Sequence, residues 1–153
     1  MEQELVALIG HRARQVRRLF FNRRGQVDES VGALEIVWDG GAITRIDTRP
    51  DWSLLISDRA WTDPFDQPAV PVDPRSVAET GRWARYDVSL RPEFRPIIGH
   101  SLRAVAVRDS EIGQPVEVDL AFPSATITIR SVGGEPIVNV YPETLPDPRP
   151  GTA

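Results

Sequence analysis

The fold of this chain is decided by residues 34–47, which read LEIVWDGGAITRID. Leu34, Ile36 and Trp38 occupy every second position, and a period of two is typical of a β-strand with one buried face. Asp39-Gly40 follows as a strong hairpin-turn signal, because both residue types tolerate a positive φ. The alternation resumes after the turn, so the stretch predicts two antiparallel strands.

Further strands extend outward from this hairpin. On its C-terminal side, Arg49-Pro50-Asp51 predicts another turn, and a strand with one apolar face runs from Trp52 to Ile56. On its N-terminal side, the apolar residues fit both helical and strand spacing. We therefore expect a short helix over about residues 2–8 and a strand over about residues 11–21.

Internal similarity indicates a second copy of this unit. The sequence LIGH at residues 8–11 matches IIGH at residues 97–100, an offset of 89. A second block begins at Trp38 in the first copy and at Phe122 in the second, an offset of 84. The second copy predicts strands over residues 102–107, 116–122, 126–130 and 137–141.

We therefore expect a mainly β protein built from two tandem four-stranded β-meander repeats, over about residues 5–57 and 94–141. Each meander has one apolar face to cover, so the two should pack as a sandwich or a half-open barrel, with one or two short helices. Residues 1–145 read as a single β-rich domain. Residues 146–153 are rich in proline with little to bury, which predicts a disordered tail.

The linker between the copies, residues 58–93, differs from them in composition because it contains several X-Pro steps. These steps favour extended or turn conformations. Within the linker, Asp73-Pro74 predicts the start of a helix over residues 74–80. A strand is expected over residues 83–90.

Composition excludes several kinds of chemistry. The chain of 153 residues contains no cysteine, so disulfides, thiolate zinc sites and thiol catalysis are excluded. The net charge of −4 argues against a dedicated nucleic-acid partner. No apolar run is long enough for a membrane span, and the acidic N-terminus does not resemble a signal peptide. We expect a cytoplasmic protein without a membrane or a cofactor, and the sequence leaves room for a homodimer.

Positive charge is concentrated at the start of the chain. Residues 1–25 hold six arginines and two glutamates, a local charge of +4, which leaves −8 for the remainder. The segment is interpreted either as a solvated strand face that pairs with acids elsewhere or as a patch for an acidic partner. Arg17 and Arg18, near its centre, are the candidate binding residues.

Motifs for catalysis are missing from the sequence. It contains no Gly-x-Ser-x-Gly elbow, no P-loop and no Gly-x-Gly-x-x-Gly. The two histidines, His11 and His100, occupy equivalent repeat positions. They could meet as metal ligands or proton carriers, or each could begin a strand and stay packed or solvated. Since neither has a carboxylate at a ligand spacing, we expect no metal site and no enzyme.

The segment from Trp61 to Phe65 is the strongest candidate for recognition. It places two large aromatic residues and the acid Asp63 in a loop stiffened by proline. Such a loop loses little entropy on binding, although the aromatic rings could also plug the open end of the core. The tryptophans on predicted strands, Trp52 and Trp83, are expected in the core with Trp38.

The chain resembles a group of small uncharacterised bacterial β-meander proteins. The resemblance is carried by the pattern Ile-Gly-His-x-Leu-x-x-Val, by a strand ending in Trp-Asp-Gly-Gly, and by the strand Trp-Ser-Leu-Leu-Ile. Some of that group are suspected immunity proteins of toxin systems, so the resemblance implies a protein-binding role and no catalytic residue. We expect a non-enzymatic protein-binding module. The alternative is a small-molecule binder or atypical enzyme with a site between the repeats, lined by His11 and His100.

Overall fold

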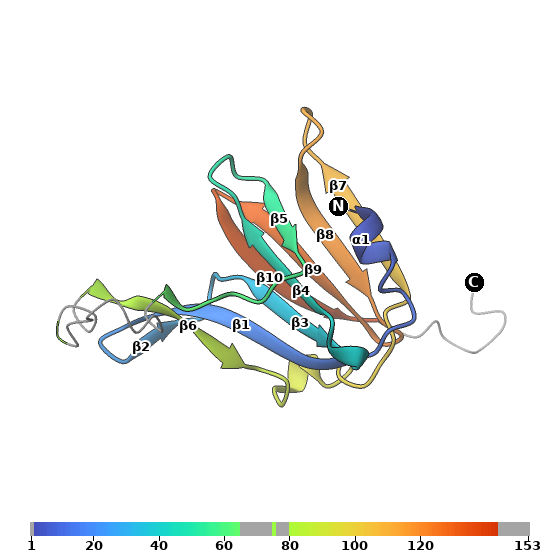
Figure 1. Cartoon of the computed structure of the whole chain (residues 1–153), viewed down its shortest axis with the longest axis horizontal. Helices are drawn as coiled ribbons and strands as arrows, with labels where there is room; N and C mark the ends of the chain where they lie inside the picture. Colours follow the sequence, from blue (N-terminus) through green and yellow to red (C-terminus); the bar gives the residue numbers. More distant parts are fainter. Residues whose placement is uncertain (1, 65–74, 76–79, 144–153) are drawn as a thin grey trace, which may run out of the picture.

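The computed structural model describes residues 2–64, 75 and 80–143 (Figure 1). The described part is mainly β, and it contains one short α-helix, ten strands and two short 3₁₀ turns. Their bounds are α1 Glu2–Val6, β1 Ala13–Arg23, β2 Gln26–Asp28, β3 Leu34–Trp38, η1 Asp39–Gly41, β4 Ile43–Thr48, β5 Leu54–Ser57, β6 Arg82–Asp87, η3 Pro92–Phe94, β7 Ala104–Asp109, β8 Pro115–Ala121, β9 Ala125–Val132 and β10 Glu135–Pro142.

The strands form two antiparallel sheets. The six-stranded sheet has the order β2-β1-β3-β4-β5, with β6 paired to β1, and the four-stranded sheet has the order β10-β9-β8-β7. Figure 1 shows the two sheets as layers that diverge towards the β4–β5 and β7–β8 turns. The sheets do not close into a barrel. No helix in the described ranges is long and apolar enough to cross a membrane.

The hairpin predicted over residues 34–47 is present. The N–H of Trp38 donates to the carbonyl of Ala42 at 2.8 Å, and η1 makes the turn between them. Gly40 has a φ of 81°, which is the left-handed conformation that favours glycine at this position. The Asp39-Gly40 signal therefore identified the turn correctly.

One apolar core lies between the two sheets. The buried faces of β1, β3, β4 and β5 share a single hydrophobic cluster with those of β8 and β9. At its centre the rings of Trp38 and Phe122 are stacked, with centroids 6.1 Å apart. The indole N–H of Trp38 donates to the hydroxyl of Thr44 at 2.9 Å, so this buried polar atom is satisfied.

The repeat offset of 84 does not hold across the turn of the first hairpin. At that offset Ile43 aligns with Ile127, but the structure pairs Ile43 with Val37 on the outer face of its sheet, whereas Ile127 is buried opposite Leu120. The reason is a difference in turn length, because the bond from Trp38 to Ala42 encloses three residues and the corresponding bond from Phe122 to Ala125 encloses two. A slip of one residue exchanges the two faces of a strand.

The segments that carry the repeated Ile-Gly-His sequence lie side by side. They exchange four main-chain hydrogen bonds, Gly10 N–H to Leu102 O, Leu102 N–H to His11 O, Gly99 N–H to Ala13 O, and Ala13 N–H to His100 O. When each residue is replaced by its match at the offset of 89, one pair of bonds becomes the other, because Gly10 matches Gly99, His11 matches His100 and Ala13 matches Leu102. Arg12 and Ser101, which are matched at the same offset, are bridge partners at the centre. We call this pairing the crossing.

Several expectations need correction. Trp52 lies in the β4–β5 turn with 63% of its surface exposed, and Trp83 is exposed on β6, so neither is in the core. The cause for Trp52 is that the turn opened by Arg49 continues to Ser53, whose carbonyl accepts the Arg49 N–H. The strand expected over residues 83–90 ends at Asp87. The helix expected over 74–80 and the tail at 146–153 lie outside the described residues, apart from residues 75 and 80.

Candidate functional site

The outer face of the six-stranded sheet carries a row of charged side chains. The strand registers place Asp87, Arg17, Glu35, Arg45 and Ser57 next to one another across β6, β1, β3, β4 and β5. The sequence predicts that Glu35 faces solvent, since it alternates with the buried Leu34 and Ile36. It is instead fully buried, because other side chains and a loop cover this part of the face.

Glu35 is held by two guanidinium groups. Its Oε1 lies 2.7 Å from Nε of Arg85 on β6 and 3.2 Å from Nε of Arg17 on β1. A fully buried carboxylate loses its hydration, and paired cations are the usual compensation in folded proteins. Removing Glu35 would therefore leave two cations, Arg17 on β1 and Arg85 on the neighbouring β6, without the carboxylate that separates their charges.

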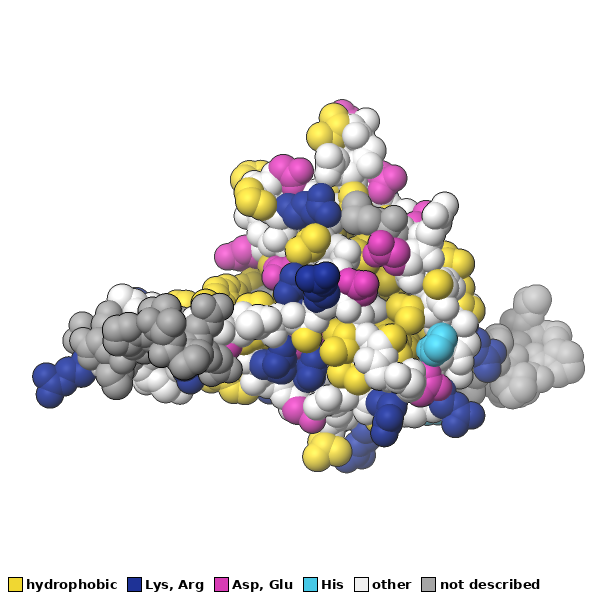
Figure 2. Space-filling view, viewed as in Figure 1, with side chains coloured by type: hydrophobic (Ala, Val, Ile, Leu, Met, Phe, Trp, Pro, Cys, Tyr) yellow, Lys and Arg dark blue, Asp and Glu magenta, His cyan; other side chains and the backbone are white. Residues whose placement is uncertain are grey.

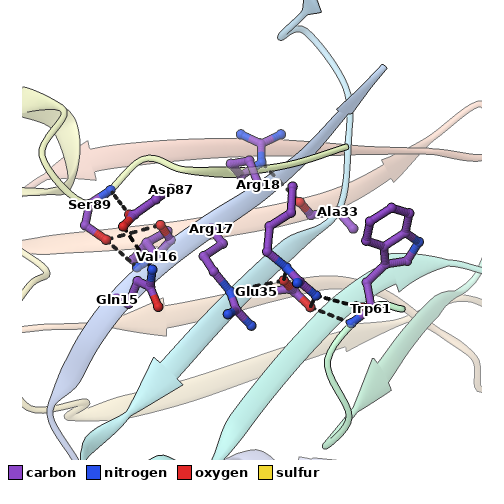
Figure 3. Close-up of polar contacts among 10 residues, drawn as sticks. Gln15, Val16, Arg17, Arg18, Ala33, Glu35, Trp61, Asp87 and Ser89 are labelled. Carbon is purple, nitrogen blue, oxygen red and sulfur yellow. Dashed lines mark hydrogen bonds and ion pairs between the residues drawn. The ribbon is translucent and has the colours of Figure 1, made fainter. Parts of the chain in front are cut away.

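The same carboxylate fixes the segment that contains Trp61. The Trp61 N–H donates to Oε2 of Glu35 at 2.6 Å, and the Trp61 carbonyl accepts a hydrogen bond from Nη2 of Arg85. Figure 3 shows the indole ring turned away from Glu35 while the main chain stays bound to it. The Arg85 guanidinium also lies 5.8 Å from the centre of the Trp61 ring. These hydrogen bonds hold Trp61 through its main chain, so its indole ring is free to contact other groups.

The structure brings together some of the predicted binding residues and separates others. Arg17 and Trp61 meet at Glu35, and Asp63 lies two residues further along the same segment. Arg18 is on the opposite face of β1, because successive side chains of a strand point to opposite faces. Phe65 lies outside the described residues. No observation tests binding by these five residues, so their assignment stays a prediction.

Arg18 has a structural environment of its own. Its Nη2 donates to the carbonyl of Gly32 at 3.0 Å and its Nε to that of Ala33 at 3.3 Å. Burial and, to a smaller extent, the nearby Arg91 cation lower the pKa of Arg18 to about 10, although Glu29 acts in the opposite direction. The side chain therefore stays charged at neutral pH, and its hydrogen bonds hold the end of the loop that precedes β3.

Asp87 ends the charged row at β6. Its carboxylate accepts hydrogen bonds from the Ser89 N–H and from Nε2 of Gln15, both at 2.9 Å. Desolvation alone would raise the pKa of Asp87, but these hydrogen bonds and the nearby Arg17 outweigh it and hold the pKa below its usual value. The ionised form of Asp87 is therefore the one that the fold stabilises.

A cavity of about 230 Å³ adjoins Trp61 and lies where the two sheets meet. Trp61 and Trp83 line it together with two carboxylates, Asp47 at the end of β4 and Glu135 at the start of β10. The remaining wall is formed by Leu19, Val31, Gly32, Ala33, Thr48, Gly134 and Pro136. Sequence reasoning singled out Trp61 but assigned Trp83 to the core, and it had no signal for the two acids.

The histidines lie within the crossing, next to its central pair, and do not line this cavity. Both side chains are exposed, and Nδ1 of His11 is 2.9 Å from Oδ1 of Asp39. The described residues contain no group of three or more histidine or carboxylate side chains that could hold a metal ion. The main chains of the two repeat positions are neighbours, and the ring of His11 is bound to Asp39.

A surface with exposed hydrophobic side chains lies at the tips of the β4–β5 and β7–β8 turns. Trp52 and Ile112, which are 63% and 82% exposed, line a groove of about 360 Å³ with the acids Asp51 and Glu111. Figure 2 shows hydrophobic side chains at the surface of both tips, with acidic side chains beside them. Sequence reasoning missed this surface because it placed Trp52 on a strand.

The backbone at Trp52 is strained. Its φ of 71° is a left-handed conformation that a bulky residue rarely adopts, and such strain costs about 1–3 kcal/mol. The indole packs against Gly134, where an added Cβ would lie 2.9 Å from Cδ1 of the Trp52 ring. The fold therefore holds a large aromatic ring at an exposed tip.

Comparison of the chain with family models, with curated proteins and with solved structures found no match.

Proposed function

We propose that this chain is a non-enzymatic protein-binding module whose partner docks on the groove between Trp52 and Ile112. The observation that carries the proposal is the strained, exposed Trp52. Strained residues and exposed aromatic side chains both cluster at functional sites, and tryptophan is enriched among the residues that dominate binding energy. An exposed large hydrophobic side chain on each of two neighbouring turns makes a surface that a partner can cover.

The groove favours a partner segment with an apolar side chain flanked by basic residues. Asp51 and Glu111 line the groove, and none of the arginines in the described part of the chain does. Hydrogen bonds from the N–H and hydroxyl of Ser53 hold the pKa of Asp51 below its usual value, so its carboxylate is ionised at neutral pH. Complementary charge at the rim increases the rate of association and the specificity of a complex.

The proposal is tested by affinity capture from the native host with the full chain as bait. Ile112→Ala and Trp52→Ala should each lose a specific partner that the unmodified chain retains. Leu90→Ala, which removes an apolar side chain that is 93% exposed and lies outside the groove, is the matched control and should retain it. Recovery of no specific partner, or equal recovery with all variants, would overturn the proposal. Loss with Trp61→Ala alone would move the binding surface to the Trp61 segment.

The immunity-like role implied by the resemblance is a narrower form of this proposal. It requires that the captured partner be a toxin encoded next to this chain. Expression of the partner alone should then stop growth, and co-expression of the chain should restore it, whereas Ile112→Ala should not. A captured partner that is harmless when expressed alone would remove this role and leave the protein-binding function.

A second candidate function is small-molecule binding in the cavity beside Trp61. It is favoured by the position of the cavity, which is lined by residues of both sheets, such as Leu19 on β1 and Pro136 on β10. Ligand sites in proteins are commonly concave and lined by aromatic side chains with a few polar groups. At about 230 Å³ the cavity would hold a small group rather than a nucleotide.

We also infer that the two meanders are copies of one unit. The equivalent hydrogen bonds of the crossing support this, since Gly10 and Gly99 donate to residues that are themselves matched at the same offset. A separate chain comprising residues 1–64 would then pair with itself through the same segment. Analytical ultracentrifugation should find a dimer, and a folded monomer would contradict the inference.

A further inference from the structure

We propose that the cavity between Trp61 and Trp83 binds an organic cation, an ammonium or a guanidinium group. The inference rests on the second candidate function and names the class of its ligand. The group could belong to a free small molecule or to an arginine or lysine side chain of a protein partner, and the same chemistry recognises both.

The first support is the pair of indole rings. Trp61 and Trp83 both line the cavity, and tryptophan has the strongest attraction for cations among the aromatic side chains. Aromatic cages are a common solution for binding quaternary ammonium groups. The backbone of Trp61 is fixed by Glu35 and Arg85, so little ordering is needed when a ligand enters.

The second support is negative charge without a counter-ion. Asp47 and Glu135 line the same cavity, and neither takes part in the ion pairs formed within the described ranges. Oδ1 of Asp47 accepts the N–H of Thr48 at 2.8 Å, which leaves Oδ2 for a ligand. Two carboxylates beside two indoles favour a cation over an anion or a neutral apolar group.

The third support is the state of the nearest cation of the protein. Arg85 lies over the Trp61 ring but is bound to Glu35 through Nε at 2.7 Å. The Arg85 guanidinium shows that a cation can pack against the Trp61 ring. Because Glu35 neutralises the charge of Arg85, a cationic ligand in the cavity is repelled less by it. The volume of about 230 Å³ matches a single head group or the end of a side chain.

The proposal is tested with the full chain and two pairs of probes. Tetramethylammonium is compared with tert-butanol, and methylguanidinium with methylurea, because each pair has a similar shape and differs in charge. Binding is followed by the four indole N–H signals in ¹H–¹⁵N NMR spectra, assigned with Trp61→Phe and Trp83→Phe. We expect the cations to shift the signals of Trp61 and Trp83 saturably and to bind about tenfold or more tightly than their neutral partners.

Variants separate the role of charge from the role of shape. Asp47→Asn combined with Glu135→Gln should weaken cation binding by about tenfold or more, and added salt should weaken it further. Glu93→Gln, an exposed carboxylate outside the cavity, should bind as the unmodified chain does. Unchanged affinity in the double variant would overturn the proposal.

The remaining outcomes distinguish failure of the ligand class from failure of the site. Equal affinity for charged and neutral probes would refute the cation and retain small-molecule binding. No saturable shift at Trp61 or Trp83 with any probe would refute both. An arginine placed within a short peptide should bind more tightly than methylguanidinium if the natural source is a partner side chain, and no more tightly if it is a free cation. Either result supports the shared chemistry.

Discussion

Substitution of Glu35 by glutamine tests the central polar contact of this fold. The change keeps the shape of the side chain and one acceptor for the Trp61 N–H, but it removes the charge that faces Arg17 and Arg85 at 3.2 and 2.7 Å. Breaking a buried ion pair by removing one partner costs about 3–5 kcal/mol. The two arginines are 16% and 33% exposed, so water can partly replace the lost charge. We therefore expect a loss of about 3 kcal/mol in the free energy of unfolding.

The assay is urea unfolding at pH 7, followed by tryptophan fluorescence. A loss of about 3 kcal/mol corresponds to a fall in Tm of about 6–12 °C for a chain of this size. Glu117→Gln is the matched control, because Arg108, its ion-pair partner at 2.7 Å, is mostly exposed. Surface pairs contribute about 0–1 kcal/mol. A loss for Glu35→Gln no larger than that of the control would refute the view that this carboxylate holds the outer face together.

Three further predictions concern stability and pH. Gly32→Ala should cost more than about 3 kcal/mol in urea unfolding, because the new Cβ would lie 1.8 Å from a main-chain oxygen. Gly25→Ala is the control, because Gly25 also has a positive φ but lies in open space, and it should cost about 1–2 kcal/mol. Equal losses in the two variants would contradict the close approach at Gly32. Phe122→Ala should cost about 3–5 kcal/mol in thermal unfolding through loss of its stacking on Trp38, and a loss below about 1 kcal/mol would contradict its central place in the core. The lowered pKa of Asp87 means that its carboxylate stabilises the fold above about pH 4 and loses this effect as the pH falls through the folded-state pKa. The stability difference between the unmodified chain and Asp87→Asn should therefore shrink from pH 6 to pH 3, and a constant difference would contradict the assignment.

The strands could be predicted from the sequence because their signals are local. The alternation around Ile36 and the turn at Asp39-Gly40 are contained in the strands that they specify. The N-terminal helix was also expected, although it is shorter than residues 2–8. What the sequence could not show is that β6, from the linker, pairs with β1, because this pairing joins residues 60 to 70 positions apart, from Asn22–Arg82 to Arg17–Asp87. No periodicity within either segment encodes that partnership.

The site was less predictable than the fold for the same reason. Glu35 reads as a solvent-facing residue, and it is buried only because Arg85 and the Trp61 segment come from elsewhere in the chain. Trp52 reads as the first residue of a strand, but the turn signalled by Arg49-Pro50-Asp51 extends to Ser53 and therefore includes Trp52. Arg17 and Arg18 are adjacent in sequence and read as one binding patch, yet the strand separates them onto opposite faces. In each case, a contact that is distant in sequence decided the outcome.

The crossing also affects how quickly the chain can fold. Its hydrogen bonds join residues 92 and 86 positions apart, Gly10 with Leu102 and Ala13 with Gly99. Closing a loop of this length costs about 2 kcal/mol more in chain entropy than closing a ten-residue loop. The hairpins can form locally, so we expect the crossing to form late, after the barrier to folding has been passed. Substitutions at the crossing should then shorten the lifetime of the folded state while leaving the folding rate nearly unchanged.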